Sequence, residues 1–175
     1  MSETVIKPIN EQQQSKVILQ TEHFIRLAEK RYDCQLPRIP LQFNLKGRAS
    51  GMYVVRHTER YFRFNPYLFA KYFDEALLST IPHEVAHYVT DVLYGLNNIK
   101  PHGIEWQSVM RDFGVEPRVT GRYDLTGVPV RRQRRFSYSC ACMSHQVSSS
   151  RHNKIRTGKT AYFCRKCGDP IVPAK

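Results

Sequence analysis

The chain has 175 residues, of which 41% are hydrophobic and 24% charged, and its formal net charge is +12. This length allows one domain with a small appendage and excludes two full-sized domains, and the composition is that of a globular chain rather than a disordered one. The longest apolar run has four residues, whereas a membrane-spanning helix needs about 20. Because no basic region followed by an apolar segment opens the chain, we expect neither a membrane nor an exported protein, and a cytoplasmic location.

The N-terminal part of the chain predicts a helix followed by a small sheet. Residues 1–14 are polar and predict a flexible N-terminus, and apolar residues at three- and four-residue steps predict a helix over 15–32. Strict alternation over 41–46 predicts a half-buried strand, and two further strands are expected over 52–56 and 60–64.

Two more helices are expected after the sheet, over residues 74–94 and 103–113. The longer helix carries an apolar stripe of Leu78, Ile81, Val85, Val89 and Val92. Helices that follow a small sheet predict an α+β domain.

The longer helix also carries the pattern His83-Glu84-x-x-His87. The helical period puts the two histidines about 40° apart, on the face opposite the apolar stripe. Two imidazoles one turn apart can bind one zinc ion, and a carboxylate beside them can hydrogen-bond a zinc-bound water and take its proton. This motif predicts a catalytic zinc site with Glu84 as general base.

A catalytic zinc needs a third protein ligand and an open fourth position. The metzincin pattern is excluded, because Thr90 and Leu93 stand where it requires glycine and histidine. His102 and Glu105 both remain candidates, and the loop before them can bring either residue back to the first two ligands. Gly103, beside His102, allows the backbone to pass close to a metal.

The C-terminal segment differs from the rest in charge and cysteine content. Residues 127–175 hold 11 Lys and Arg residues and one acidic residue. Four cysteines cluster here, which indicates a structural zinc site rather than disulfides in a reducing cytosol. We expect the ligands to be Cys140, Cys142, Cys164 and Cys167, with His145 as a substitute for Cys140 or Cys142 and His152 as a further rival.

The basic residues of this segment predict an interface with nucleic acid, since arginine and lysine neutralise phosphates. The candidate contacts are Arg131, Arg132, Arg134, Arg135, Arg151, Lys154 and Arg156. Aromatic residues lie between them and can stack on unpaired bases. For Tyr138 and Tyr162 we favour a place in the core of the ribbon.

The motifs in combination resemble the SprT family of zincin-type metallopeptidases over about residues 40–172. They are His83-Glu84-x-x-His87, His102-Gly103-x-Glu105-Trp106 and the Cys/His ribbon. The resemblance implies a zincin-like fold, with His83, His87 and His102 as zinc ligands, Glu84 as general base and Glu105 as a nearby structural residue. Eukaryotic relatives in this family, the Spartan proteases, cleave proteins covalently trapped on DNA. The resemblance therefore implies DNA-bound protein substrates.

We therefore expect four segments: a flexible N-terminus (1–14), a zincin-like domain (15–126), a basic linker (127–136) and a zinc ribbon (137–175). The expected function is zinc-dependent proteolysis of DNA-associated proteins, with the ribbon binding DNA. A non-catalytic, zinc-containing DNA-binding module and a metallohydrolase acting on a non-peptide substrate remain as alternatives. Tyr88, Tyr94, Tyr123 and the arginines are all candidates for stabilising an oxyanion.

Overall fold

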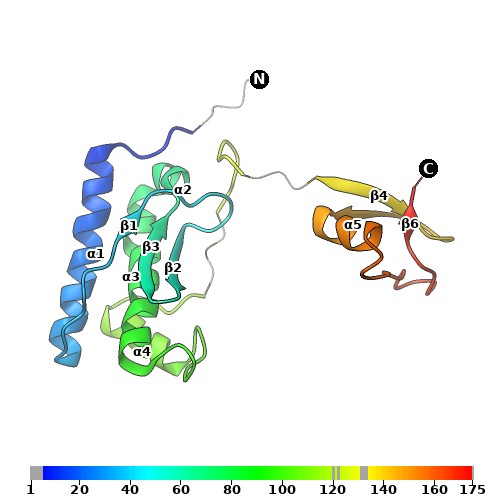
Figure 1. Ribbon diagram of the computed structural model, residues 1–175. Coiled ribbons are helices and arrows are strands. Elements are labelled where there is room, and N and C mark those ends of the chain that lie inside the picture. The colour runs from blue at the N-terminus through cyan, green and yellow to red at the C-terminus, as the bar shows by residue number, and fades with distance from the viewer. Residues whose placement is uncertain (1–5, 120, 122, 131–133, 175) are drawn as a thin grey trace. The chain divides into compact units, whose positions relative to one another are not determined.

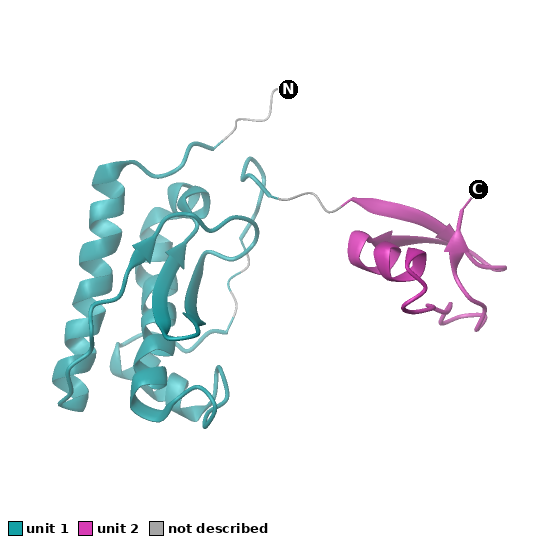
Figure 2. Ribbon diagram, viewed as in Figure 1, with its two compact units in different colours: residues 1–130 teal, residues 131–175 magenta. Residues whose placement is uncertain are grey.

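The computed structural model describes residues 6–119, 121, 123–130 and 134–174. The chain forms two compact units, residues 1–130 and residues 131–175 (Figure 2). Within the part that the structure describes, no helix combines the length and the apolar character needed to cross a bilayer.

Helix α1 (Glu11–Tyr32) begins earlier than its apolar periodicity predicts. The side chain of Asn10 accepts a hydrogen bond from the Gln13 N–H, and the Gln13 side chain accepts one from the Asn10 N–H. This capping box satisfies two backbone donors at the helix start. Ile9, just before the cap, is buried. Residues 11–14 of the segment predicted as a flexible N-terminus therefore form the first turn of α1, because polar residues supply the cap of the helix.

The sheet of the first unit has the strand order β1-β3-β2 (Figure 1). Strand β1 (Leu41–Gln42) pairs parallel to β3 (Glu59–Phe64), and β2 (Gly51–Arg56) pairs antiparallel to it. The predicted strand over 41–46 is wrong beyond Gln42. Leu45 is still buried, and its N–H donates to the carbonyl of the last residue of β3. Alternation indicated correctly that Leu45 faces inward, but the backbone leaves the ladder.

The helical layer of the first unit is built around α3 (Phe73–Tyr94), which packs against α1, β2, the short helix α2 (Pro66–Lys71) and α4 (Ile104–Asp112). Helix α2 was not expected; Asn65 caps it, and Pro66 occupies a position where a missing N–H costs little.

Helix α3 is buried over most of its circumference rather than along one stripe. Ile81, Val85 and Val89 are fully buried, as predicted, but Leu78 is 63% and Val92 40% exposed. Residues off the predicted stripe, Glu84 among them, are buried as well. The physical reason is that helices and a sheet edge surround α3, so a one-sided amphipathic pattern does not describe its burial.

Over residues 134–174, the second unit consists of a three-stranded sheet with the strand order β5-β4-β6 and one helix. Its elements are β4 (Arg135–Ser139), β5 (Ser144–Ser148), α5 (Ser149–Arg156) and β6 (Val172–Pro173). The core consists of Tyr138, Val147, Cys164 and Ile171, which confirms a core position for Tyr138. A core of four buried residues is too small to stabilise a domain by hydrophobic burial alone.

Candidate active site and ribbon metal centre

Three histidines converge in the first unit. His83 and His87 lie one turn apart on α3, and His102 reaches them from the loop before α4. Their Nε2 atoms are 3.2 Å apart in all three pairs. Tetrahedral zinc with zinc–nitrogen bonds of about 2.05 Å separates two nitrogens by about 3.3 Å, so the group fits three corners of a zinc site. Of the two candidates for the third ligand, the structure brings His102 into the group and leaves Glu105 outside it.

Burial favours the neutral form of the three imidazoles. It lowers the pKa of His83 to about 4 and that of His87 to about 3, with a smaller contribution from the neighbouring histidines. The pKa of His102 is also lowered by burial. A neutral imidazole has a free lone pair, which is the form that binds a metal.

Trp106 supports the histidine group from the first turn of α4. It is fully buried, and its ring centroid lies 4.8, 5.6 and 4.7 Å from those of His83, His87 and His102. Its Nε1–H donates to the carbonyl of His83 at 3.3 Å. Trp106 therefore restricts the orientation of all three rings, a role that the sequence analysis missed.

Glu84 lies beside the group, and its position depends on strand β2. Its Oε2 accepts a hydrogen bond from the backbone N–H of Tyr53 at 2.7 Å. Burial raises the pKa of Glu84 to about 7, although the hydrogen bond from Tyr53 opposes that shift. A Cβ on Gly51 would lie 2.7 Å from Glu84 Cγ and 2.7 Å from Thr80 Cγ2. The strand can approach Glu84 this closely because residue 51 is glycine.

A second contact holds β2 on α3. The hydroxyl of Tyr53 donates to Asp91 Oδ2 at 2.6 Å, and Arg60 Nε donates to the same oxygen at 2.7 Å. Asp91 is buried and lies two helical turns beyond Glu84. Through its backbone N–H and its hydroxyl, Tyr53 therefore ties the strand to two carboxylates of one helix.

A cavity of about 410 Å³ opens onto the histidines and Glu84. Its walls come from β2, from α3 and from the loop after α3. The residues around it are Gly51, Met52, Tyr53, Val55, His83, Glu84, His87, Thr90, Leu96, Ile99, Pro101 and His102.

None of the tyrosines considered for oxyanion stabilisation lines this cavity. Tyr88 is fully buried and donates to the carbonyl of Pro37. The hydroxyl of Tyr123 lies 3.2 Å from Thr80 Oγ1, and Tyr94 is 45% exposed at the end of α3.

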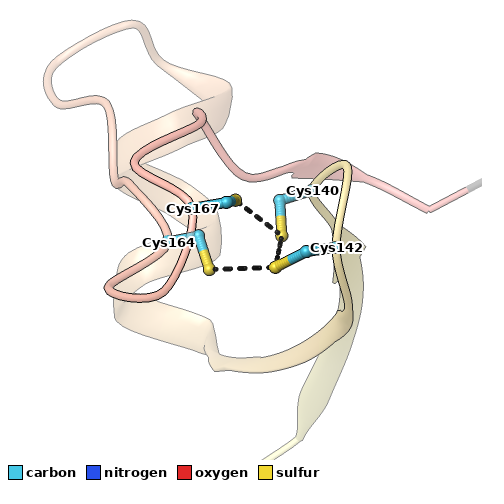
Figure 3. A group of neighbouring side chains, drawn as sticks. All are labelled: Cys140, Cys142, Cys164 and Cys167. Carbon is cyan, nitrogen blue, oxygen red and sulfur yellow. Dashed lines mark hydrogen bonds between the residues drawn. The ribbon is translucent and has the colours of Figure 1, made fainter.

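The four clustered cysteines form the second candidate metal site, in the ribbon (Figure 3). The sulfur of Cys140 lies 3.5 Å from that of Cys142 and 3.7 Å from that of Cys167, and the sulfurs of Cys142 and Cys164 are 3.7 Å apart. Tetrahedral zinc with zinc–sulfur bonds of about 2.3 Å separates two sulfurs by about 3.8 Å. The four cysteines thus fit a closed zinc site.

The rival histidines lie outside the group of four sulfurs. His145 Nε2 is 3.2 Å from the Cys140 sulfur, and a hydrogen bond from the imidazole lowers the pKa of that thiol. His152 stacks on Phe136 at 3.7 Å between ring centroids, and its Nδ1 lies 3.0 Å from the hydroxyl of Tyr138. His145 therefore contacts a ligand sulfur, whereas His152 belongs to the packing of β4 against α5.

The predicted nucleic-acid contacts are exposed where the structure describes them. These are Arg134, Arg135, Arg151, Lys154 and Arg156; Arg131 and Arg132 lie outside the described residues. The guanidinium of Arg134 lies 4.9 Å from the ring centroid of Phe136, and that of Arg151 5.3 Å from that of Tyr162. Among the described residues, none of the five forms an ion pair with an acidic side chain.

Comparison with known proteins places the chain in a family. The profile of the SprT-like family matches residues 20–134. The chain is 36% identical to Protein SprT of Vibrio parahaemolyticus over 148 residues, which cover 84% of this chain and 86% of that protein. It is 32% identical to Protein SprT of Pasteurella multocida over 171 residues, covering 97% of each chain. The solved structures contain no match. The chain belongs to the SprT-like family.

Proposed function

We propose that this protein is a zinc-dependent metallopeptidase with a zincin-type fold, which hydrolyses DNA-associated proteins and contacts DNA through its ribbon. The observation that carries the proposal is the convergence of three imidazole nitrogens at 3.2 Å beside a buried carboxylate. A cytoplasmic location is part of the proposal, because a reducing compartment keeps the ribbon thiols available for a metal.

The chain's own groups supply the parts that peptide hydrolysis needs. His83, His87 and His102 would hold the zinc ion, and bound zinc supplies Lewis-acid polarisation of a carbonyl and of water. Glu84 would take the proton of the attacking water at its carboxylate and pass it to the leaving amine. A pKa near neutrality suits a group that both accepts and releases a proton.

Strand β2 supplies a surface for an extended polypeptide. It is an edge strand of the sheet, so one side of its backbone has no partner strand among the described residues. The N–H of Tyr53 reaches Glu84 rather than β3, and in an antiparallel pair such outward groups recur at every second residue. A substrate strand could pair with the outward backbone groups of residues 51 and 55 and with the carbonyl of Tyr53, whose N–H is held by Glu84.

The proposed DNA interface rests on the charge of the ribbon. The exposed basic side chains on β4 and α5 have no acidic partners in the described structure, so they are free to neutralise phosphates. Each phosphate contact adds to the dependence of binding on salt, which gives this part of the proposal a measurement of its own.

The first experiment compares zinc-loaded wild type with Glu84→Gln on a basic DNA-binding protein, with and without single-stranded DNA. The matched control is Glu105→Gln, which makes the same chemical change on α4 outside the histidine group. We expect cleavage by wild type and Glu105→Gln, and none by Glu84→Gln. Retained cleavage by Glu84→Gln would refute the mechanism. Two bound zinc ions and DNA affinity without turnover of any substrate would favour a binding module, and turnover of a non-peptide substrate alone would favour another metallohydrolase.

The second experiment measures DNA affinity against salt concentration for a triple variant of Arg151, Lys154 and Arg156 to alanine. The control triple removes the same charge from exposed residues of the first unit, namely Lys16, Lys30 and Lys46. We expect the ribbon variant to bind more weakly and to lower the salt slope by about 2 to 3, with little change in the control. Equal effects of both triples would refute the assignment of DNA contact to the ribbon.

A further inference from the structure

The cavity at the histidine group is lined by apolar side chains from two segments of the chain. Met52 and Val55 come from β2, and Leu96, Ile99 and Pro101 come from the loop after α3. Leu96 is 42% and Met52 41% exposed, so both side chains lie at the surface, where an incoming ligand can cover them. The gain from removing such surface from water favours an apolar occupant.

The small number of charged groups in the cavity also favours an apolar occupant. Glu84 is the one carboxylate among the residues that line it, and none of these residues is a lysine or arginine. Its carboxylate is already held by the backbone N–H of Tyr53. A lysine or arginine side chain that lies against the apolar walls would therefore lose water without meeting a carboxylate there, which is unfavourable.

The edge strand determines how a substrate would present its side chains. An extended peptide paired with β2 alternates its side chains between the two faces of the sheet. Helix α3, with the histidines and Glu84, packs on one of these faces. Every second substrate side chain would then point toward the cavity, and one of them would lie beside the peptide bond at the histidine group.

From these contacts we infer that the cavity selects an uncharged, apolar substrate side chain next to the bond that is cleaved. The inference rests on the proposed peptidase function and adds its specificity. It also makes a prediction that the substrate class alone would not. In a basic DNA-binding protein, the cuts fall beside residues such as leucine, methionine or phenylalanine, and not beside the abundant lysines and arginines.

The test uses peptides that are identical except at one central position, which holds leucine, lysine or glutamate. The variant is Leu96→Glu, which puts a carboxylate on the cavity wall at a partly exposed position. The control is Leu19→Glu, which makes the same change on α1 at a side chain 69% exposed and outside the cavity. Cleavage is measured as kcat/KM on the full-length, zinc-loaded chain. Binding of the same peptides to full-length Glu84→Gln is measured by fluorescence anisotropy, which needs no turnover.

For wild type we expect the leucine peptide to be cleaved at least about 10-fold better than the lysine peptide. Leu96→Glu should reduce this preference about 10-fold or reverse it, and Leu19→Glu should leave it unchanged. Equal kcat/KM for the leucine and lysine peptides, or the same behaviour of the two variants, would overturn the inference while leaving the peptidase function standing. Preferential binding of the leucine peptide without cleavage by any form would support the cavity's selectivity and refute the hydrolysis. Peptides that are neither bound nor cleaved would overturn both.

Discussion

Replacing Gly51 with alanine tests how closely the position of Glu84 depends on strand β2. The added Cβ would lie 2.7 Å from Glu84 Cγ and from Thr80 Cγ2, whereas two carbons normally approach to about 3.5–4.0 Å. The strand or the Glu84 side chain must therefore move by about 1 Å. Misplacement of a catalytic group by that distance costs about 100-fold in rate, and overpacking of this kind costs about 1–3 kcal/mol of stability.

The assay is kcat/KM for peptide cleavage, measured beside the midpoint of urea unfolding and the zinc content. We expect Gly51→Ala to lose about 100-fold in kcat/KM and to keep its zinc, because the atoms nearest the added Cβ belong to Glu84 and Thr80 and not to the histidines. The backbone of Gly51 lies outside the left-handed region, so the contact and not the backbone causes the loss.

The matched control is Gly114→Ala. Gly114 has φ +72° and no atom within 4 Å of an added Cβ. Its replacement strains the backbone by about 1–2 kcal/mol without touching Glu84. The two variants should therefore lose comparable stability, but only Gly51→Ala should lose activity. A folded Gly51→Ala protein with wild-type kcat/KM would refute the conclusion that strand β2 needs glycine at position 51 to lie this close to Glu84.

Three further variants test other contacts. Tyr53→Phe removes the hydroxyl that donates to Asp91 at 2.6 Å, and we expect a loss of about 1.5–3 kcal/mol in the free energy of unfolding by urea. Cys164→Ser, at a cysteine shared by the sulfur group and the ribbon core, should bind one zinc ion fewer and lose amide protection from hydrogen exchange over 134–174. Asp112→Asn removes a carboxylate whose pKa is lowered, first by the hydrogen bond from Tyr32. A lowered folded-state pKa stabilises the native state above the unfolded-state pKa of about 3.9, so this variant should be less stable than wild type at pH 7, and the difference should shrink as the pH falls below about 4.

Each of these variants has an outcome that contradicts its reasoning. Unchanged stability of Tyr53→Phe would mean that the Asp91 contact contributes nothing measurable. Cys34→Ser is the control for the ribbon, because Cys34 lies outside the sulfur group; equal loss of zinc in both cysteine variants would refute the ribbon site. A stability difference for Asp112→Asn that is constant from pH 7 to pH 2 would show that the carboxylate charge is not responsible.

Local patterns predicted the long elements well and the short ones poorly. The helix around His83 and the strands over 52–56 and 60–64 agree with α3, β2 and β3 to within one residue at each end. Helix α5 was missed because none of its residues is buried, so it has no apolar periodicity to detect. The strand over 41–46 was overestimated because alternation reports which side chains face inward and not where backbone pairing stops.

The sequence by itself determined the chemistry of the candidate ligands. Two histidines and a glutamate at helical spacing are a local pattern, and the four cysteines of the ribbon are recognisable by their type and by the basic segment around them. These features need no knowledge of the fold, because one helical turn sets the distance between His83 and His87.

Only the tertiary structure decided which side chains surround that motif. It brought His102 rather than Glu105 to the first two histidines, put Trp106 against all three rings, and set Tyr53 on Glu84 across 31 residues of chain. The physical reason is that such contacts join segments distant in sequence. They depend on how the sheet edge and the helices pack around α3, and no local spacing of residues specifies that packing.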